Sequence, residues 1–588
     1  MICLIRPPLY LALLIGLYVS FLQVYDVLAI PVSNWIDGTP YLIENSQRFL
    51  VIKDDIRYAP SAQSPQIGDQ RRFYAVDFSK SGRAYFVDAT CRSVGKFCYI
   101  FVEDTQWQKG IVTNTGINRI KKAFDDSTPA NNAKGIYQIL TENLGMPPDE
   151  IDLDPKIYIL ILDIPDPVNT NENFVAGYFE PMNQRRGILR DPISGMQFRS
   201  NEVEMIYLDS SPLDIESVMA REILAHEFQH LIHWKYDPDE DLWINEGCSE
   251  YASLFLCGYG SNGYSSRVEA FERNPEISLV YWKSGMSNSL ANYGASYLWM
   301  LYLHEHYGGV STISSIIANS DNGINGINAV LLSKGYSQSF KDIFSDWKVA
   351  NFLDDESFES GRYSYKSLDI NLQYKTNSTY PINNRSRTTQ SWSPGYIGFS
   401  EGNHTADLII DFNADKPFYN YDVKVVSIKN GKPVAIENMP IISGKGSFSI
   451  PLFGYRVDKV MVIPNWMPNS ERDFGDIVSY TYSASLGDEI GINVTVVANA
   501  INGRYADIVA RIDGNSEMEV PKIKITRLGK IIVDGQELQK YHSKNGQNQT
   551  YMYQVFIPSG WNGSEVKWEI SYLGRPVVSG DLGSLDKR

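Results

Sequence analysis

One short stretch constrains this chain more than any other. Residues 223–235, ILAHEFQHLIHWK, bring three of the chain's seven histidines close together. In a helix, His226 and His230 lie one turn apart on the same side, with Glu227 beside them. Two imidazoles at that spacing can bind one tetrahedral metal ion, and the glutamate can reach a water molecule on it. The alternative is a core helix with merely hydrogen-bonded histidines, but this five-residue pattern arises by chance only about once in a few hundred cases.

The sequence also predicts where this helix begins. Ser211 can cap a helix, Pro212 suits the first turn, and Asp214 adds an acidic residue three positions after the cap. We therefore expect one helix that starts directly after Ser211 and runs to about Lys235.

A catalytic zinc site needs a third protein ligand, and Glu246 is the better of two candidates. It lies in a second helical segment, WINEGCSEY, and its carboxylate would close a His, His, Glu site while leaving the fourth position for water. His233 is on the correct face, but it lies a full turn beyond His230, so it fits packing or contact with a ligand better. Glu250 follows one turn after Glu246, where it can accept the free N–H of a ligand histidine.

These residues resemble the gluzincin clan of zinc metallopeptidases. His-Glu-x-x-His followed by Asn-Glu-x-x-Ser-acid looks like that clan, and AHEFQHLIHW…WINEGCSEY is most similar to its hyicolysin-type secreted members. The resemblance implies that Glu227 is the catalytic acid and base. It implies that the zinc ligands are His226, His230 and Glu246. Glu250 would be the outer partner, a position that is usually Asp in thermolysin-like relatives.

A second segment extends the resemblance, which covers about residues 86 to 370. Residues 292–309, NYGASYLWMLYLHEHYGG, resemble the helix of gluzincin aminopeptidases whose opening tyrosine stabilises the oxyanion. The match implies a catalytic role for Tyr293. A segment with four tyrosines also suits an amphipathic packing helix, so both interpretations stay open. The aminopeptidases' Gly-x-Met-Glu-Asn substrate strand is absent, so aminopeptidase action is not implied.

The rest of the sequence predicts an α+β fold. Strand patterns such as KFCYIFVED and KIYILILDI alternate with helical patterns, and they give way after residue 370 to short strands separated by turns. We expect a zincin-like domain, with a twisted sheet and a helical subdomain, followed by two Ig-like β-sandwiches. The expected segments are a signal peptide at 1–29, an N-terminal β-rich region at 30–85, the zinc metallopeptidase domain at 86–370, a β-sandwich at 371–487 and a second β-sandwich at 488–588.

The N-terminus predicts export. An apolar run, LYLALLIGLYVSFL, precedes Val27 and Ala29, which suit cleavage near Ala29. The alternative is a membrane anchor, but a span needs ~20 apolar residues and Gln23 and Asp26 interrupt this run. We expect no stable membrane insertion after cleavage. The formal net charge of −16, with no block of basic residues, is the wrong sign for binding phosphates, so nucleic acid is not an expected partner.

The cysteines and sequons fit an exported protein. Cys91 and Cys98 flank the short turn RSVGKF, and we expect a disulfide between them. Cys248 and Cys257 are too far apart along one helix to bond, so we expect buried thiols. Asn-x-Ser/Thr sequons occur in the β-rich part at about the chance rate, which leaves glycosylation open.

The leading hypothesis is a secreted zinc peptidase, an endopeptidase in the simplest case, in which a metal-activated water attacks a peptide bond with Glu227 as general base. The partner would be a protein or peptide substrate, added along a sheet edge for which residues 201–209 are the candidate strand. The alternative is a cell-surface binding or adhesion protein with a structural or vestigial zinc site. In either case the β modules are candidates for binding a cell surface or substrate. Ca²⁺ has little support, because the acidic YDPDEDLW lacks the Gly and terminal Glu of a known loop.

Overall fold

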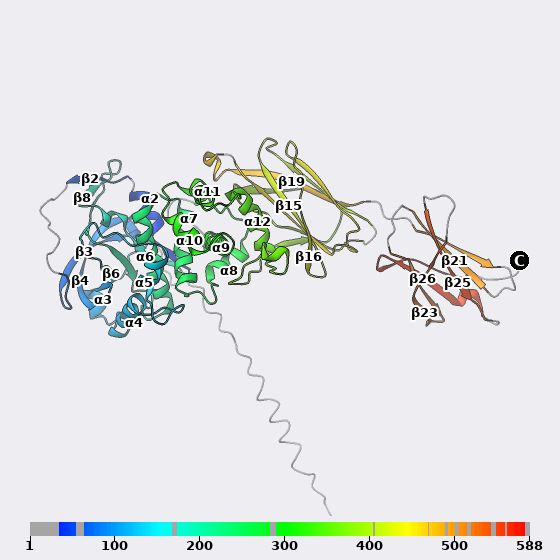
Figure 1. Cartoon of the computed structure of the whole chain (residues 1–588), viewed down its shortest axis with the longest axis horizontal. Coiled ribbons are helices and arrows are strands. Elements are labelled where there is room, and N and C mark those ends of the chain that lie inside the picture. Colours follow the sequence, from blue (N-terminus) through cyan, green and yellow to red (C-terminus); the bar gives the residue numbers. More distant parts are fainter. Residues whose placement is uncertain are drawn as a thin grey trace, which may run out of the picture.

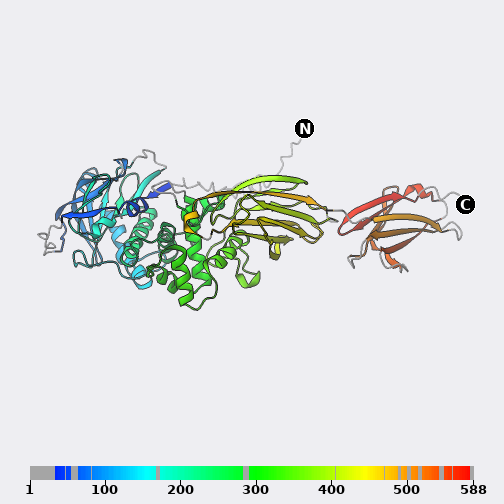
Figure 2. The ribbon, with the colours of Figure 1, turned by 90° about the horizontal axis from the view of Figure 1, so that it is seen from above.

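The computed structural model places an α/β unit, a helical region and two β-sandwiches one after another along its longest axis (Figure 1). Figure 2 shows the same order from above. The structure describes residues 34–46, 48–53, 64–80, 82–166, 173–282, 290–403, 406–468, 470–487, 492–499, 505–513, 519–541, 548–558 and 561–582. The predicted signal peptide lies outside these residues. Within them, no helix is both long enough and apolar enough to cross a membrane.

A mixed seven-stranded sheet forms the centre of the first unit, in the order β1-β7-β10-β6-β5-β4-β3. Strands β5, β6 and β10 run parallel, whereas β7 runs antiparallel to β10. These three parallel strands are almost entirely buried, as expected for a sheet covered on both faces. The strand bounds are β1 Asn34–Asp37, β3 Gln70–Asp77, β4 Arg83–Val94, β5 Cys98–Glu103, β6 Ile157–Leu162, β7 Asn173–Phe179 and β10 Met205–Asp209.

Strands from the N-terminal region belong to this same sheet. β1 forms one edge of it and β3 the other, while β4 pairs with both β3 and β5. The boundary predicted at residue 85 falls inside β4. The N-terminal β-rich region is therefore not a separate unit, because its strands are hydrogen-bonded into the large sheet. The remaining strand of this region, β2 (Leu50–Lys53), joins a small sheet with β8 (Ile188–Arg190) and β9 (Gln197–Arg199).

Helices cover one face of the large sheet. Ile159 of β6 and Ile206 of β10 share a core with Ile120 and Phe228, which come from the helices α4 and α6. The opposite face packs Tyr207 into a second core together with side chains from α2 and from the small sheet. The helices of this unit are α2 Thr39–Ser46, α3 Asp104–Gln108, α4 Asn114–Asp125, α5 Ile136–Asn143 and α6 Val218–Tyr236.

The predicted disulfide between Cys91 and Cys98 is wrong. Both thiols are free and buried, although they lie on the neighbouring strands β4 and β5. Cys91 belongs to one core and Cys98 to the core on the other face of the sheet. Side chains on opposite faces of a sheet point apart and cannot be bridged. Cys248 and Cys257 are free and buried, as predicted.

The histidine-bearing helix α6 begins later than predicted. Its cap is Ser217, whose hydroxyl accepts a hydrogen bond from the backbone N–H of Ala220 at 3.1 Å. The backbone N–H groups of Ser211 and Leu213 instead donate to the Asp209 carboxylate, at 2.9 and 3.1 Å. The side chain at the end of β10 therefore holds the predicted capping segment in a loop.

The helical region follows α6 directly. Helices α7 and α9 approach closely at Gly247, where a Cβ atom would lie 2.9 Å from the Ser296 carbonyl oxygen. A larger residue would force the two helices apart. The elements are α7 Leu242–Glu250, a π-helix Tyr251–Leu256, α8 Ser266–Arg273, α9 Leu290–His306, α10 Val310–Ile317, α11 Gly323–Ser333 and α12 Phe340–Leu353.

Two β-sandwiches follow the helices, as the strand patterns predict. The first packs a sheet of order β11-β13-β18-β15-β16 against one of order β12-β19-β14-β17, and the second packs β20-β21-β25-β24 against β23-β22-β26-β27. The strands of the first are β11 Lys375–Asn377, β12 Ile382–Gln390, β13 Ile397–Phe399, β14 Leu408–Ala414, β15 Tyr421–Lys429, β16 Lys432–Asn438, β17 Lys445–Ile450, β18 Lys459–Trp466 and β19 Ile477–Leu486. Those of the second are β20 Ile492–Asn499, β21 Tyr505–Asp513, β22 Lys522–Arg527, β23 Lys530–Glu537, β24 Gln539–Tyr541, β25 Asn548–Phe556, β26 Val566–Tyr572 and β27 Arg575–Asp581.

A buried lysine joins α12 to the first sandwich. The Lys348 ammonium donates to the backbone carbonyls of Asp422 and Ile463 at 2.9 and 3.0 Å and to the Asn465 side chain. It also pairs with the Asp422 carboxylate at 2.7 Å. Burial lowers the pKa of Lys348 to about 8, although the charge of Asp422 opposes this shift. The helical region and the sandwich therefore share an ionic contact inside their interface.

We expect Lys348→Met to destabilise this interface. The substitution keeps an unbranched side chain but leaves Asp422 without its cation, a loss that costs about 3–5 kcal/mol when the pair is buried. Urea unfolding of the full chain measures the change. Lys416→Met, at an exposed position of the same sandwich, is the matched control and should change stability by less than about 0.5 kcal/mol. Equal stability of the two variants would show that the buried pair contributes nothing.

Candidate metal centre

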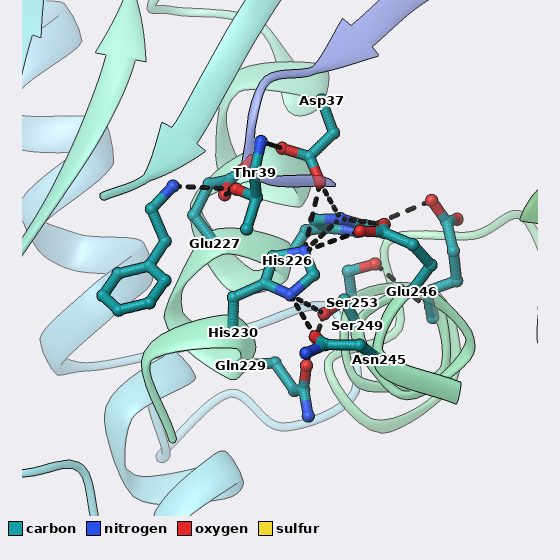
Figure 3. A network of polar contacts seen from close by, with 12 residues as sticks. Asp37, Thr39, His226, Glu227, Gln229, His230, Asn245, Glu246, Ser249 and Ser253 are labelled. Atoms are coloured by element: carbon teal, nitrogen blue, oxygen red, sulfur yellow. Dashed lines mark hydrogen bonds and ion pairs between the residues drawn. The ribbon is translucent and has the colours of Figure 1, made fainter. Parts of the chain in front are cut away.

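Helices α6 and α7 bring three sequence-predicted residues together. The Nε2 atoms of His226 and His230 lie 3.1 Å apart on α6 (Figure 3). Glu246 of α7 places Oε2 at 3.2 Å from His226 Nε2 and Oε1 at 3.5 Å from His230 Nε2. All three side chains are fully buried or nearly so. The two histidines spaced one helical turn apart and the downstream glutamate thus lie together in the structure.

A fourth donor comes from the other end of the sequence. Asp37, the last residue of β1, places Oδ2 at 3.3 Å from His226 Nε2 and 3.1 Å from His230 Nε2. The ligand atoms of Asp37, His226, His230 and Glu246 all lie within 4.8 Å of one another. No local pattern marks Asp37, because it lies far upstream in the sequence and only the pairing of β1 with β7 brings it here.

The spacing of these four donors fits a zinc ion. Bonds of about 2.0–2.2 Å in tetrahedral geometry place the ligand atoms about 3.3–3.6 Å apart. The two imidazole Nε2 atoms lie 3.1 Å from each other, and their four distances to the carboxylate oxygens of Asp37 and Glu246 run from 3.1 to 3.5 Å. Two carboxylates and two imidazoles in a dry interior also need a compensating cation. The residues present therefore suit a divalent metal, with zinc the best match to this donor set.

Glu227 lies beside the cluster and is fully buried. Its Oε2 accepts a hydrogen bond from the Thr39 hydroxyl at 2.9 Å, and its Oε1 has no hydrogen-bond partner among the described residues. Burial, together with the negative charge of Asp37, raises the pKa of Glu227 well above its ordinary value. Gly177 of β7 permits close packing here, since a Cβ there would lie 2.7 Å from Ile223 Cγ2 and 2.9 Å from the Tyr207 carbonyl oxygen, and 3.3 Å from Glu227 Cγ.

The far nitrogen of each histidine has its own partner. His226 Nδ1 lies 3.5 Å from Glu250 Oε1, which pairs with Arg267 Nε at 2.6 Å. His230 Nδ1 lies 2.6 Å from Asn245 Oδ1. For His230, the accepting Asn245 oxygen places the proton on Nδ1 and leaves Nε2 free for a metal, whereas the His226 contact with Glu250 is too long for a hydrogen bond.

Two of these partners were not predicted. Asn245 directly precedes the predicted ligand Glu246, and the motif assigns it no role of its own. Arg267 has no motif around it, and its role follows from its fully buried guanidinium. Helix α8 carries it toward α9, where Gly294 permits close approach: a Cβ there would lie 2.1 Å from the Arg267 carbonyl oxygen.

His233 lies outside the donor set. It is fully buried, and its Nδ1 lies 3.4 Å from Gln229 Nε2. Burial, with a smaller effect of His230, lowers the pKa of His233 to about 3. The ring is therefore neutral and packs beside the centre.

Two tyrosines of α9 take different positions. Tyr293 is buried, with its ring 4.1 Å from the Arg267 guanidinium carbon and 4.8 Å from the Trp282 ring. Burial raises the pKa of Tyr293 well above its ordinary value, and the negative charges of Glu246 and Asp37 add to this shift. The hydroxyl of Tyr297 instead lies near Gly263, where a Cβ would be 3.0 Å away. Of the two, Tyr293 is the one whose pKa responds to the charges of the metal cluster.

The predicted substrate strand is wrong. Within residues 201–209, β10 lies in the interior of the sheet, flanked by β6 and β7. A strand paired on both sides offers no free backbone groups to a peptide. The strand next to the centre is β7, and its outer side is occupied by β1.

Comparison with known proteins finds a distant relative. The chain is 26% identical to the neutral metalloprotease ShpI of Staphylococcus hyicus over 255 residues, which cover 40% of this chain and 52% of that protein. The chain thus spans about half the length of this relative. No family model matches the chain. The partial likeness and the buried donor set together support a metallopeptidase.

Solved structures add nothing to this assignment. The exo-chitosanase CsxA of Amycolatopsis orientalis, and a CsxA variant in complex with PNP-beta-D-glucosamine, each match with 15% identity and a TM-score of 0.13. Each match covers 32% of this chain and 24% of the other chain. A TM-score this low carries no argument about fold or function.

We expect Glu246→Gln to weaken zinc binding far more than His233→Ala. The first removes a charged donor atom, so its effect should exceed the roughly 10–100-fold loss typical of an outer partner. The second removes a ring that touches no donor atom directly. Competition with a zinc-binding dye measures both affinities. Equal losses in the two variants would instead favour His233 as a ligand.

Proposed function

We propose that this chain is a secreted zinc endopeptidase of the gluzincin type, similar to the hyicolysin-type members. The observation that carries the proposal is the position of Glu227, a buried carboxylate with one free oxygen, directly beside two histidines and a glutamate that fit a zinc ion. A site that only stabilises the fold has no use for such a base. The substrate would be a peptide or protein.

The proposed ligands of the catalytic ion are His226, His230 and Glu246. When bound, zinc supplies a Lewis acid that polarises the peptide carbonyl and lowers the pKa of water. Glu227 takes a proton from the attacking water and delivers it to the leaving amine.

Outer residues position this machinery. Asn245 orients His230 through its Nδ1 atom. Glu250 faces Nδ1 of His226 at 3.5 Å, and Arg267 holds Glu250 in place. The hydroxyl of Tyr293 would donate a hydrogen bond to the oxyanion that develops on the substrate. Its high pKa keeps the phenol protonated and able to donate.

The signal-like sequence of residues 1–29 supports the proposed secretion. The two Ig-like β-sandwiches would bind a cell surface or the substrate. The alternative function is a surface-binding protein whose zinc site is structural. One observation favours this alternative. Asp37 supplies a fourth protein ligand, and structural zinc sites are closed by four protein ligands. Activity of a metal-loaded sample on a protein substrate separates the two proposals.

Glu227→Gln should abolish hydrolysis while zinc stays bound. The amide fills the same space but cannot accept the proton from water, and general acid–base catalysis contributes about 10²–10⁴-fold. Cleavage of a quenched fluorogenic peptide library and zinc content after dialysis are the two measurements. Glu204→Gln, at another buried carboxyl directly before β10 and outside the donor set, is the control and should retain activity. A Glu227 variant that cleaves as fast as the parent would refute the mechanism.

Tyr293→Phe should lower kcat and kcat/KM by similar factors, about 10²–10³-fold, as for the loss of one oxyanion donor. KM and the melting temperature should change little, because only the hydroxyl is removed. Steady-state kinetics and thermal unfolding are compared with those of Tyr297→Phe on the same helix. If only the Tyr297 variant loses activity, the oxyanion role belongs one turn further along α9.

A further inference from the structure

The N-terminal segment 34–39 enters the proposed active site. β1 pairs in parallel with β7, with Trp35 opposite Phe174 and Asp37 opposite Gly177. The backbone N–H of Gly38 continues the contact by donating to the Gly177 carbonyl at 3.1 Å. The segment thus covers the outer edge of the strand nearest the metal cluster, where an extended peptide would otherwise pair.

Three side chains of this segment reach the catalytic residues. Trp35 is 4% exposed, stands edge-on to the His226 ring with the ring centres 5.6 Å apart, and lies 3.9 Å from the Arg267 guanidinium carbon. Trp35 and Tyr293 therefore both contact Arg267 through their rings. A large aromatic side chain is thus buried against the proposed ligand His226 and against Arg267.

Asp37 is fixed in an orientation that suits a metal ligand. Its Oδ1 accepts a hydrogen bond from the backbone N–H of Thr39 at 2.8 Å, which leaves Oδ2 facing the two imidazoles. Gly38 permits this tight turn, because a Cβ there would lie 2.6 Å from Phe78 Cζ. With Asp37 as fourth ligand, a tetrahedral ion has no position left for water.

Thr39 engages the general base. Its hydroxyl donates to Glu227 Oε2 at 2.9 Å and accepts from the backbone N–H of Phe179 at 2.9 Å. One carboxylate oxygen of Glu227 is therefore already occupied, and the hydroxyl is tied to the end of β7. A purely structural fourth ligand would not need this second contact.

We propose that residues 34–39 form a built-in inhibitor, in which Asp37 takes the fourth ligand position and Thr39 occupies Glu227, so that hydrolysis requires withdrawal of the segment. The inference rests on the proposed zinc peptidase function. It explains a four-ligand site that also keeps a general base. Asp37 could be an inhibitory or a structural ligand, and the two roles differ in one respect. An inhibitory ligand can leave without loss of the ion, whereas a structural ligand cannot.

The test uses the full chain with Asp37→Ala and Asp37→Asn, the second of which preserves the size of the side chain if the first does not fold. Zinc content after dialysis, cleavage of a quenched fluorogenic peptide library and binding of acetohydroxamate to the cobalt-loaded protein, followed by visible absorption, are measured for each. We expect zinc to be retained, and both cleavage and acetohydroxamate affinity to rise more than about tenfold, since binding is limited by the fraction of open sites. Glu44→Ala, at an exposed position of α2, is the control and should behave as the parent.

A peptide added in trans provides the second arm. The hexapeptide of residues 34–39, NWIDGT, should inhibit the Asp37→Ala protein, and the same peptide with the Asp37→Ala change should not. Loss of zinc from both Asp37 variants would overturn the proposal in favour of a structural ligand. Retained zinc with unchanged acetohydroxamate affinity would also overturn it, because the fourth position would not have been blocked. Absence of zinc binding by every protein, the parent included, would instead refute the proposed function itself.

Discussion

Two carboxylates and two imidazoles are buried together, and their burial constrains the structure of the rest of the first unit. Each charge taken out of water costs several kcal/mol unless it is paired, and here Asp37 and Glu246 face His226 and His230 in the buried interior. A divalent cation held by these donors would balance the two negative charges. The three elements that carry these donors, β1, α6 and α7, must therefore arrive together, and the close packing of α7 on α9 at Gly247 holds one of them in place.

The part of the site that could be predicted is the part that depends on the spacing of residues along a single helix. His226 and His230 share a helix face because of their spacing alone, and Glu246 and Glu250 repeat the same spacing on the next helix. Asp37 has no such signal. It reaches the cluster because β1 pairs with β7, and a parallel pairing between segments so far apart in the sequence depends on the whole sheet.

The fold shows the same division between local and long-range information. Strand and helix patterns predict the α+β class and the two sandwiches, since alternation and helical periodicity are local properties. The start of α6 depends on Asp209 at the end of β10 binding the backbone of Ser211, which no capping rule contains. The interior position of β10 follows from strand order, and the opposite faces of Cys91 and Cys98 follow from the register of β4 on β5. The sequence leaves both open.

The interface around Lys348 has a consequence for how the chain divides. Trp392, Tyr396 and Met461 of the first sandwich are buried in the same apolar core as Trp347 of α12. A chain cut near residue 370, where the sequence changes its texture, would leave that core open to water on one side. A fragment that keeps every buried member of this core must extend at least to Met467, so the change in sequence texture near residue 370 and the end of this core fall at different places.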